Sequence, residues 1–409
     1  MKLLAGLLRL DAFLYFINLI TAAQPFFGGG TDSYRRKVSL ELNPDPSGSS
    51  NVSVLHVRAV GGNDTLHFLW SSLGVPTLLL VHTDSPETRV QIDWARLLSG
   101  NASGSLTVEP ASAVQYSTAF LFSKIWEYSD GRNSADQSQA AVDSYFPPYS
   151  LEEFTWEDSN RTLNRSALTA QLCGRNQSQH SGRVCFQISA FESWGRDPAW
   201  PRLLHSSNSS QLRFVIEGVP PRSNRSRFAL ELLSIDSRDH EVREETRRSI
   251  DDEYTPSIFQ VSRLVSVHAN SSAPVLSYAQ WKPVAYRTAS PVFEDSTPCR
   301  HSPCTPLLQP PRLGLALAFF GGALDQGYRA SAVNISFGVP GEPYYNATGY
   351  LSWSCLLGLG SPPEDSFSPL VLGIMAVGLG TPALLLLVGG ACVCGQRLRR
   401  QQPGYAPIS

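Results

Sequence analysis

Residues 370–394 read LVLGIMAVGLGTPALLLLVGGACVC and contain no charged side chain. A helix of this length extends about 37 Å at about 1.5 Å per residue, enough to cross a hydrocarbon core of about 30 Å. The core helix of a soluble protein is the alternative, but such helices are rarely so long and so apolar. Two acidic residues precede the segment, and three arginines follow it before residue 401. This asymmetry predicts a transmembrane helix with a cytosolic C-terminus.

Residues 395–409 then form a cytosolic tail that is too short to bury a core. Near its end stand Gly404, Tyr405 and Ile408, in the pattern Gly-Tyr-x-x-Ile. An extended tail of this kind offers the tyrosine and the bulky apolar side chain to two pockets of a clathrin adaptor. Four-residue patterns often match by chance, but the position at the end of a short tail favours a lysosomal sorting signal. We therefore predict delivery to the lysosomal membrane.

The N-terminus has the features of a secretory signal peptide over residues 1–23. Lys2 precedes a mostly apolar run, and the small residues at its end suit cleavage after Ala23. Charged residues interrupt the apolar run, so an uncleaved anchor is the alternative. In either case residues 24–368 are predicted to form a luminal ectodomain.

Asparagines give a second strong signal, because eleven of the fourteen stand in the N-x-S/T pattern that accepts N-linked glycans. A single triplet is weak, but this density behind a secretory signal predicts a heavily glycosylated ectodomain whose acceptors lie at the surface. The predicted acceptors are Asn51, Asn63, Asn101, Asn160, Asn164, Asn176, Asn208, Asn224, Asn270, Asn334 and Asn346.

The net charge is only −2, and the hydrophobic fraction is 42%, so a sizeable core can form. Basic residues are matched by acidic residues along the same stretches. A nucleic-acid surface needs clustered lysine and arginine, so nucleic acid is not an expected partner.

Five of the seven cysteines lie before the predicted span. Cys173 and Cys185 could close a short disulfide between two strands, which leaves three thiols, Cys299, Cys304 and Cys355, for one bridge and one unpaired cysteine. The stretch from Cys299 to Cys304 also has zinc-ligand types through His301, but no second ligand pair with zinc spacing follows it. We therefore favour disulfide over metal, and we expect no metal or cofactor.

Cys392 and Cys394 lie at the cytosolic edge of the span. Acylation and a simple membrane-filling role are both open for them.

Period-two alternation of apolar residues dominates the ectodomain. It is clearest around residues 90–94, 120–128, 184–188 and 212–216. Turn clusters such as residues 61–64 separate the runs at intervals too short for β-α-β crossovers. The prediction is a mostly antiparallel, sandwich-like β fold.

A charged stretch at residues 236–253 is a candidate border between subdomains. A solvated loop or linker explains it best, with a short surface helix or a processing site as alternatives. Near the membrane, residues 361–364 read Ser-Pro-Pro-Glu and predict a stiff stem.

Catalytic signatures are not evident in the sequence. It contains no Gly-x-Ser-x-Gly elbow, no HExxH and no phosphate loop. Asp251, Asp252 and Glu253 could supply a general acid and base, but capping a turn or helix start is the simpler interpretation. Glycosidases place their two carboxylates far apart in sequence, so an enzyme is not excluded.

Small residues at positions 373, 376, 380 and 383 fall on one face of the predicted span. Gly373, Ala376, Gly380 and Ala383 would let another helix approach closely, although small residues are common in such helices anyway.

The chain resembles the glycosylated lysosomal membrane protein family over nearly its whole length. The resemblance is carried by residues 55–74, PPYSL at 147–151, SIDDEYTPSIFQ at 249–260, AQWKPVAY at 279–286 and the segment from Tyr350 through the span. It implies a type I lysosomal protein without known catalysis. It also implies an accessory subunit that protects a lysosomal dipeptide transporter of the major facilitator superfamily from luminal proteolysis.

Two function classes therefore remain. One is the accessory subunit, and the other is a luminal enzyme or sugar-binding receptor of unknown specificity. Partner dependence separates them, because loss of a subunit should lower the level of a multi-spanning partner, whereas an enzyme should turn over a substrate unaided.

Overall fold

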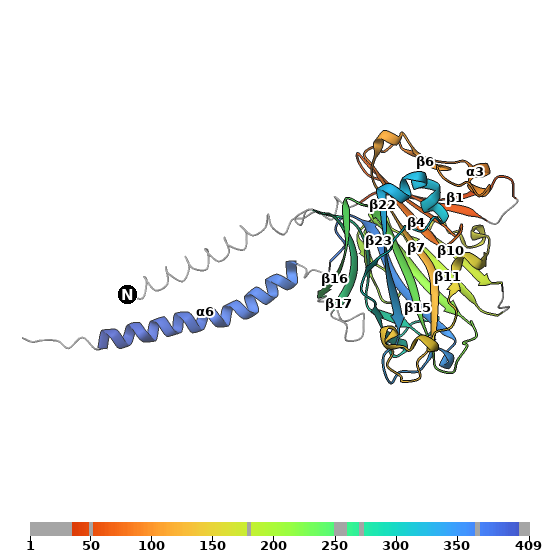
Figure 1. Ribbon diagram of the computed structural model, residues 1–409. Helices are drawn as coiled ribbons and strands as arrows, with labels where there is room; N and C mark the ends of the chain where they lie inside the picture. Colours follow the sequence, from red (N-terminus) through yellow and green to blue (C-terminus); the bar gives the residue numbers. More distant parts are fainter. Residues whose placement is uncertain are drawn as a thin grey trace, which may run out of the picture. The chain divides into compact units, whose positions relative to one another are not determined.

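The computed structural model describes residues 35–48, 52–177, 181–248, 260–269, 274–364 and 369–400 (Figure 1). Within these ranges the chain forms a β-rich unit that ends at Glu364 and a separate helix, α6 (Pro369–Arg400). The predicted signal peptide and the sorting residues Gly404, Tyr405 and Ile408 lie outside the described residues, so both stay predictions.

The first large sheet of the β-rich unit is antiparallel throughout, in the order β1-β2-β3-β4-β7-β15-β22. Short strands extend it, β8 beside β7 and both β20 and β21 beside β22. The strands are β1 (Lys37–Pro44), β2 (Ser53–Val60), β3 (Thr65–Ser71), β4 (Thr77–Thr83), β7 (Val114–Ser129), β8 (Tyr149–Ser150), β15 (Ser226–Ser237), β20 (Ser296–His301), β21 (Thr305–Pro306) and β22 (Tyr328–Phe337).

The second large sheet is also antiparallel, in the order β9-β10-β11-β14-β23-β18-β17-β16. Strand β19 pairs with β23 and with β20, and β20 continues onto β22, so the two sheets are joined at this corner. The strands are β9 (Phe154–Trp156), β10 (Thr169–Asn176), β11 (Arg183–Ala190), β14 (Ser209–Glu217), β16 (His240–Arg248), β17 (Gln260–His268), β18 (Val275–Trp281), β19 (Val284–Tyr286) and β23 (Tyr350–Leu359).

A row of buried aromatic rings joins the two sheets. Phe122 of β7 contacts Phe186 of β11 with ring centroids 5.2 Å apart, and Phe186 contacts Phe214 of β14 at 5.4 Å. Phe214 in turn lies 6.3 Å from Phe337 of β22. Burying each such ring contributes about 1.5–3 kcal/mol, and the row fixes how the sheets face each other. The predicted antiparallel sandwich is confirmed.

Smaller elements complete the β-rich unit. Two hairpins are formed by β5 (Arg89–Ile92) with β6 (Leu106–Glu109) and by β12 (Gly195–Arg196) with β13 (Leu204–His205). The helices are α3 (Trp94–Leu98), α4 (Gly314–Phe320) and α5 (Leu324–Gly327). Short 3-10 turns occur at Ala111–Ala113, Gln137–Gln139, Val142–Ser144, Leu151–Glu153, Ser159–Thr162, Phe293–Asp295, Gly321–Ala323 and Tyr345–Ala347.

Helix α4 lies against β4 and β6, which is why β4 is buried on both faces. Gly314 begins this helix at φ 54°, and a Cβ there would lie 2.5 Å from the carbonyl oxygen of Leu73. Only glycine therefore suits this close approach.

Two local expectations need correction, and a third is not tested. The alternating run from residue 90 ends as a strand at Ile92, because Asp93 caps α3 by accepting a hydrogen bond from the Arg96 amide. The loop or linker predicted from residue 236 is wrong as far as Arg248, because these residues complete β15 and form β16. Asp251, Asp252 and Glu253 lie outside the described residues.

The predicted stem packs on the β-rich unit rather than standing free. Pro362 is buried, the Pro363 carbonyl accepts a hydrogen bond from Gln280 Nε2 (3.1 Å), and Arg263 Nη1 lies 2.8 Å from Glu364 Oε1. The second sheet therefore holds the chain in place up to Glu364.

Helix α6 contains Gly373–Arg397, the one segment among the described residues that is long and apolar enough to cross a membrane. Its mean hydropathy is 2.0. Gly373, Ala376 and Ala383 are exposed and Gly380 is half exposed, so the predicted small-residue face is free for contact within the described part of the chain. Cys392 and Cys394 are exposed thiols on the same helix.

Candidate functional site: the glycan acceptors and the polar clusters of the β-rich unit

Every described acceptor asparagine reaches the surface of the β-rich unit. Asn51 and Asn270 lie outside the described residues, and glycan occupancy stays a prediction at every position. The exposed acceptors are Asn63, Asn101, Asn160, Asn164, Asn224 and Asn346, and the half-exposed ones are Asn176, Asn208 and Asn334.

Asn334 differs from the acceptors in turns because it lies within β22, opposite Glu231 of β15. Its Oδ1 atom is buried and has no hydrogen-bond partner among the described residues. A glycan on Asn334 would therefore have to reach the surface from the amide nitrogen, because the amide oxygen faces the interior.

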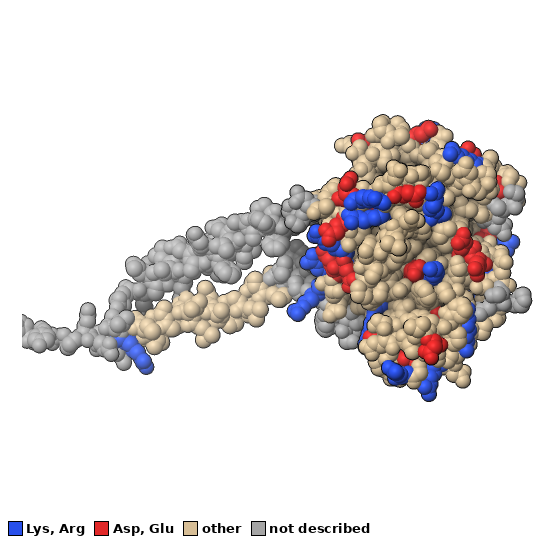
Figure 2. All heavy atoms as spheres, viewed as in Figure 1, with Lys and Arg blue, Asp and Glu red and all other residues tan. Residues whose placement is uncertain are grey.

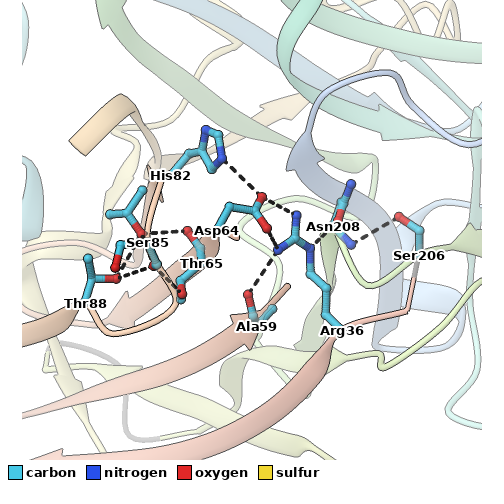
Figure 3. A network of polar contacts seen from close by, with 10 residues as sticks. Arg36, Ala59, Asp64, Thr65, His82, Ser85, Thr88, Ser206 and Asn208 are labelled. Carbon is cyan, nitrogen blue, oxygen red and sulfur yellow. Dashed lines mark hydrogen bonds and ion pairs between the residues drawn. The ribbon is translucent and has the colours of Figure 1, made fainter. Parts of the chain in front are cut away.

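Arg36 holds a polar cluster next to two of the acceptors (Figure 3). Its guanidinium binds both carboxylate oxygens of Asp64, at 2.7 and 2.6 Å, and its Nε donates to Asn208 Oδ1 at 2.7 Å. His82 Nε2 lies 3.2 Å from Asp64 Oδ2. Asp64 follows the acceptor Asn63, so the cluster joins the β2–β3 turn to the start of β14.

The charge state of Asp64 follows from these contacts. Burial by itself would raise the pKa of this carboxyl, but hydrogen bonds and charge from Arg36, with a further contribution from His82, hold the pKa below its usual value. The Arg36–Asp64 pair therefore persists in acid that would protonate an ordinary aspartate.

A pair of buried histidines lies under the β2–β3 pairing. His56 Nε2 is 2.9 Å from His67 Nδ1, and His67 Nε2 is 2.9 Å from the Thr88 hydroxyl. Burial, followed by repulsion from His67 and Arg58, lowers the pKa of His56 to about 3. Burial and then Arg58 lower the pKa of His67 to about 4. Both rings are thus neutral in the folded protein even in moderate acid.

Asp130 and Arg227 form a buried ion pair at another place in the β-rich unit. Arg227 Nε lies 2.8 Å from Asp130 Oδ2, and both side chains are 3% exposed. Arg227 Nη2 also donates to Asn133 Oδ1 (2.8 Å), and the guanidinium lies over the Tyr344 ring. Burial would raise the pKa of Asp130, but backbone hydrogen bonds from Ala135 and the contacts of Arg227 lower it.

The arrangement closest to catalytic chemistry is built on Asp236. This buried carboxylate accepts from the Tyr116 hydroxyl (2.5 Å) and lies 2.6 Å from His240 Nδ1. A carboxylate that orients a histidine is half of a Ser-His-Asp arrangement. Among the described residues, however, no serine or cysteine hydrogen-bonds to the other ring nitrogen of His240. Tyr116 is hydrogen-bonded to Ser277 Oγ (2.7 Å), and burial, then Asp236, raises its pKa.

Cys173 and Cys185 form the predicted disulfide. They face each other in the β10–β11 pairing with Cα atoms 4.1 Å apart, so the bridge joins neighbouring strands.

The bridge expected among the other three cysteines before the predicted span is wrong. Cys299, Cys304 and Cys355 are all unpaired. Cys299 lies in β20 opposite Phe337, and Cys355 lies in β23 opposite Leu212. Both are buried, which raises the pKa of each thiol and makes it unreactive.

Glu244 contacts the Cys299–Cys304 stretch at two places: it lies 3.2 Å from His301 Nδ1, and it accepts a hydrogen bond from the Cys304 backbone amide at 3.2 Å. His301 also lies against the Trp281 ring. Across the described residues, no group of three or more His, Cys, Asp or Glu side chains could hold a metal ion.

Basic and acidic side chains are interspersed on the face that Figure 2 shows. That face therefore presents no extended basic surface of the kind that binds nucleic acid.

An apolar helix able to span a membrane, joined to a β-sandwich unit with acceptor asparagines at its surface, defines a class of membrane-anchored proteins. The chain belongs to the glycosylated lysosomal membrane protein family, whose pattern matches residues 53–400.

Curated relatives carry the same description. A glycosylated lysosomal membrane protein of Danio rerio is 48% identical over 398 residues, covering 95% of this chain and 96% of the relative. Glycosylated lysosomal membrane protein B of Xenopus laevis is 45% identical, covering 91% and 93%. The glycosylated lysosomal membrane protein of Homo sapiens is 38% identical, covering 91% and 90%. The family name describes a lysosomal membrane glycoprotein and not an enzyme.

Proposed function

We propose that this protein is a non-catalytic accessory subunit of a lysosomal major-facilitator transporter, a dipeptide carrier. In this role its glycosylated β-rich unit lies in the lumen, shields the luminal loops of the transporter from proteases and so stabilises it. The C-terminus of α6 lies in the cytosol, where the tail binds a clathrin adaptor. The family membership and the resemblance stated above carry the proposal.

The stem contact supports a shielding role. Arg263 and Gln280 hold the chain at residues 363 and 364, and only four residues separate Glu364 from α6. Fully extended, five chain steps span at most about 18 Å. A connection of only four residues suits a role in covering luminal loops next to the membrane.

The polar clusters also fit a binding role better than catalysis. Glu127 is fully buried and is held by Tyr149, Ser226 and the Arg222 amide, so its carboxylate stabilises the fold. Arg227 is committed to Asp130 in the same way. A protein that covers a partner in a protease-rich compartment needs such a rigid, internally satisfied body.

The test uses cells that lack the protein and measures the level of the transporter that co-purifies with it. Three chains are returned: the full protein, the β-rich unit on an unrelated apolar span, and a chain with only residues 361–409 after a signal peptide. The first should restore the transporter fully and the second largely, because a luminal interface of about 1,600 Å² outweighs one helix contact.

The third chain should not restore the transporter. If it does, shielding is wrong, and Gly373, Ala376, Gly380 and Ala383 carry the function through helix packing. A lysosomal transporter that does not co-purify serves as the control for general changes in lysosomal proteolysis.

The alternative of a luminal enzyme rests on Asp236 and His240. It predicts that a soluble β-rich unit turns over a luminal substrate unaided and that His240→Gln abolishes the turnover. Transporter levels would then be unaffected by His240→Gln. An accessory subunit, by contrast, should turn over no substrate unaided.

A further inference from the structure

A groove of about 470 Å³ lies on the β-rich unit where the chain leaves the second sheet toward α6. Its walls include Trp194, Asn208, Arg263 and the stem residues 361–364. Volumes of about 300–1,000 Å³ are typical of pockets that hold a ligand. An indole face beside charged and amide groups is the combination that binds the apolar face and the polar edge of a sugar ring.

Asn208 is the described acceptor that lines this groove, and its amide is held in one orientation. Its Oδ1 accepts the hydrogen bond from Arg36 Nε at 2.7 Å, while Nδ2 points away from Arg36 and makes no contact with the residues drawn (Figure 3). An N-linked sugar is attached at Nδ2 and leaves Oδ1 a carbonyl acceptor. The Arg36 contact is therefore compatible with a glycan and aims its attachment point.

Trp194 is 49% exposed, and contacts of its neighbours in the chain hold the backbone on either side of it. Phe191 stacks on His205 with ring centroids 3.5 Å apart, and the Arg36 amide donates to the Glu192 carbonyl at 3.1 Å. The β12–β13 hairpin begins at the next residue, with Gly195 opposite His205. The molecule thus presents an open indole in the same groove as the oriented acceptor.

We propose that the oligosaccharide on Asn208 folds back into this groove and that its first N-acetylglucosamine packs against Trp194. The apolar face of the sugar covers the indole. Hydroxyl and acetamide groups meet the Glu245–Arg247 ion pair that also lines the groove, where Arg247 Nη2 lies 2.9 Å from Glu245 Oε2. This glycan is then part of the folded structure, unlike the glycan on an exposed turn such as Asn224.

The test is a double-mutant cycle on the full-length glycoprotein, with Asn208→Asp and Trp194→Ala. Asn208→Asp cannot be glycosylated but keeps a carboxylate oxygen for Arg36, so it removes the sugar and leaves the Arg36 contact. Asn224→Asp is the matched control, because it removes a glycan from an exposed turn. Glycopeptide mass spectrometry first measures occupancy of Asn208, and thermal unfolding then measures Tm.

Trp194→Ala should lower Tm by about 2 °C in the wild-type and Asn224→Asp proteins and should have no further effect in Asn208→Asp. An endoglycosidase that leaves one N-acetylglucosamine should preserve the Trp194→Ala effect, whereas complete removal of the glycan should abolish it. This enzymatic comparison decides the question if Asn208→Asp does not fold. An unoccupied Asn208, or an equal Trp194→Ala effect with and without the glycan, overturns the proposal.

Discussion

Two buried polar clusters of the β-rich unit respond to acid over different pH ranges. Asp130 and Arg227 are both charged, and the contacts of the carboxylate lower its pKa. His56 and His67 are both neutral, with pKa values lowered to about 3 and about 4. The first cluster buries two charges that compensate each other, whereas the second buries two neutral rings whose unfolded forms bind protons more readily.

The sign of each effect follows from proton linkage. Asp130 has a folded pKa below its unfolded value, so its contribution is present above the unfolded pKa and is lost only as pH falls through the folded pKa. The histidines have folded pKa values below the unfolded value of 6.5. Their unfolded forms therefore take up protons first, and stability falls as pH drops below about 6.5. The histidine pair therefore begins to lose stability at a higher pH than the Asp130–Arg227 pair does.

The largest effect is expected from Arg227→Met. It leaves the Asp130 carboxylate buried without its partner, which typically costs about 3–5 kcal/mol of the free energy of unfolding. Urea unfolding at neutral pH measures the loss. The double variant Arg227→Met/Asp130→Asn should recover part of it, and a loss below about 1 kcal/mol for the single variant would contradict the ion-pair interpretation.

The double variant His56→Gln/His67→Gln should flatten the acid dependence of stability. Each histidine contributes a slope of about 1.4 kcal/mol per pH unit between its folded and unfolded pKa values, so the pair contributes about 2.7 kcal/mol per pH unit from about pH 6 to pH 4. The free energy of unfolding measured at several pH values shows the slope. His268→Gln, at an exposed position, is the control, and an unchanged slope in the double variant would show that other groups set the acid response.

Arg36→Gln should cost about 1 kcal/mol, because Arg36 is mostly buried while Asp64 is 29% exposed. The pKa of Asp64 is lowered in the folded protein, so the cost should be full at neutral pH and should disappear as the carboxyl is protonated. Unfolding of both proteins at neutral and strongly acidic pH tests this. A cost that persists in strong acid would assign the effect to the Asn208 contact instead.

Arg312→Gln sets the lower limit of the comparison. Arg312 and Asp325 are 2.6 Å apart, but their side chains are 56% and 46% exposed. Exposed pairs contribute about 0–1 kcal/mol, so the change should lie within about 0.5 kcal/mol at every pH. A larger loss would mean that surface pairs, and not buried clusters, dominate the electrostatics of this fold.

Alternation in the sequence predicts the strands that form the core but not the polar clusters. The apolar side chains of β7, β11 and β14 are buried in the core, and their period-two spacing is visible in the sequence. β16 was missed because it has few apolar side chains, as expected of a strand at the sheet edge. The membrane helix was predicted because its composition alone carries the signal.

The candidate site could be predicted only in part. Asparagine triplets and the Cys173–Cys185 spacing are local patterns, so they are visible in the sequence. His67 and Thr88 are separated by 21 residues and come together only in the fold. The groove likewise brings Trp194 and Asn208 together with β-strand and stem residues far along the chain. A local sequence pattern does not predict contacts between residues so far apart in the chain.

Strand β16 has a consequence for how copies of the molecule behave at high concentration. Among the described residues it pairs with β17 on one side only, which leaves a backbone edge that another strand could join. Its Glu241 and Arg243 are ion-paired at 2.8 Å, and the Arg243 hydrogen bond lowers the pKa of Glu241. Charged side chains discourage strand addition and aggregation at such an edge. Because Glu241 stays ionised to lower pH than an ordinary glutamate, this protection continues after the surroundings become acidic.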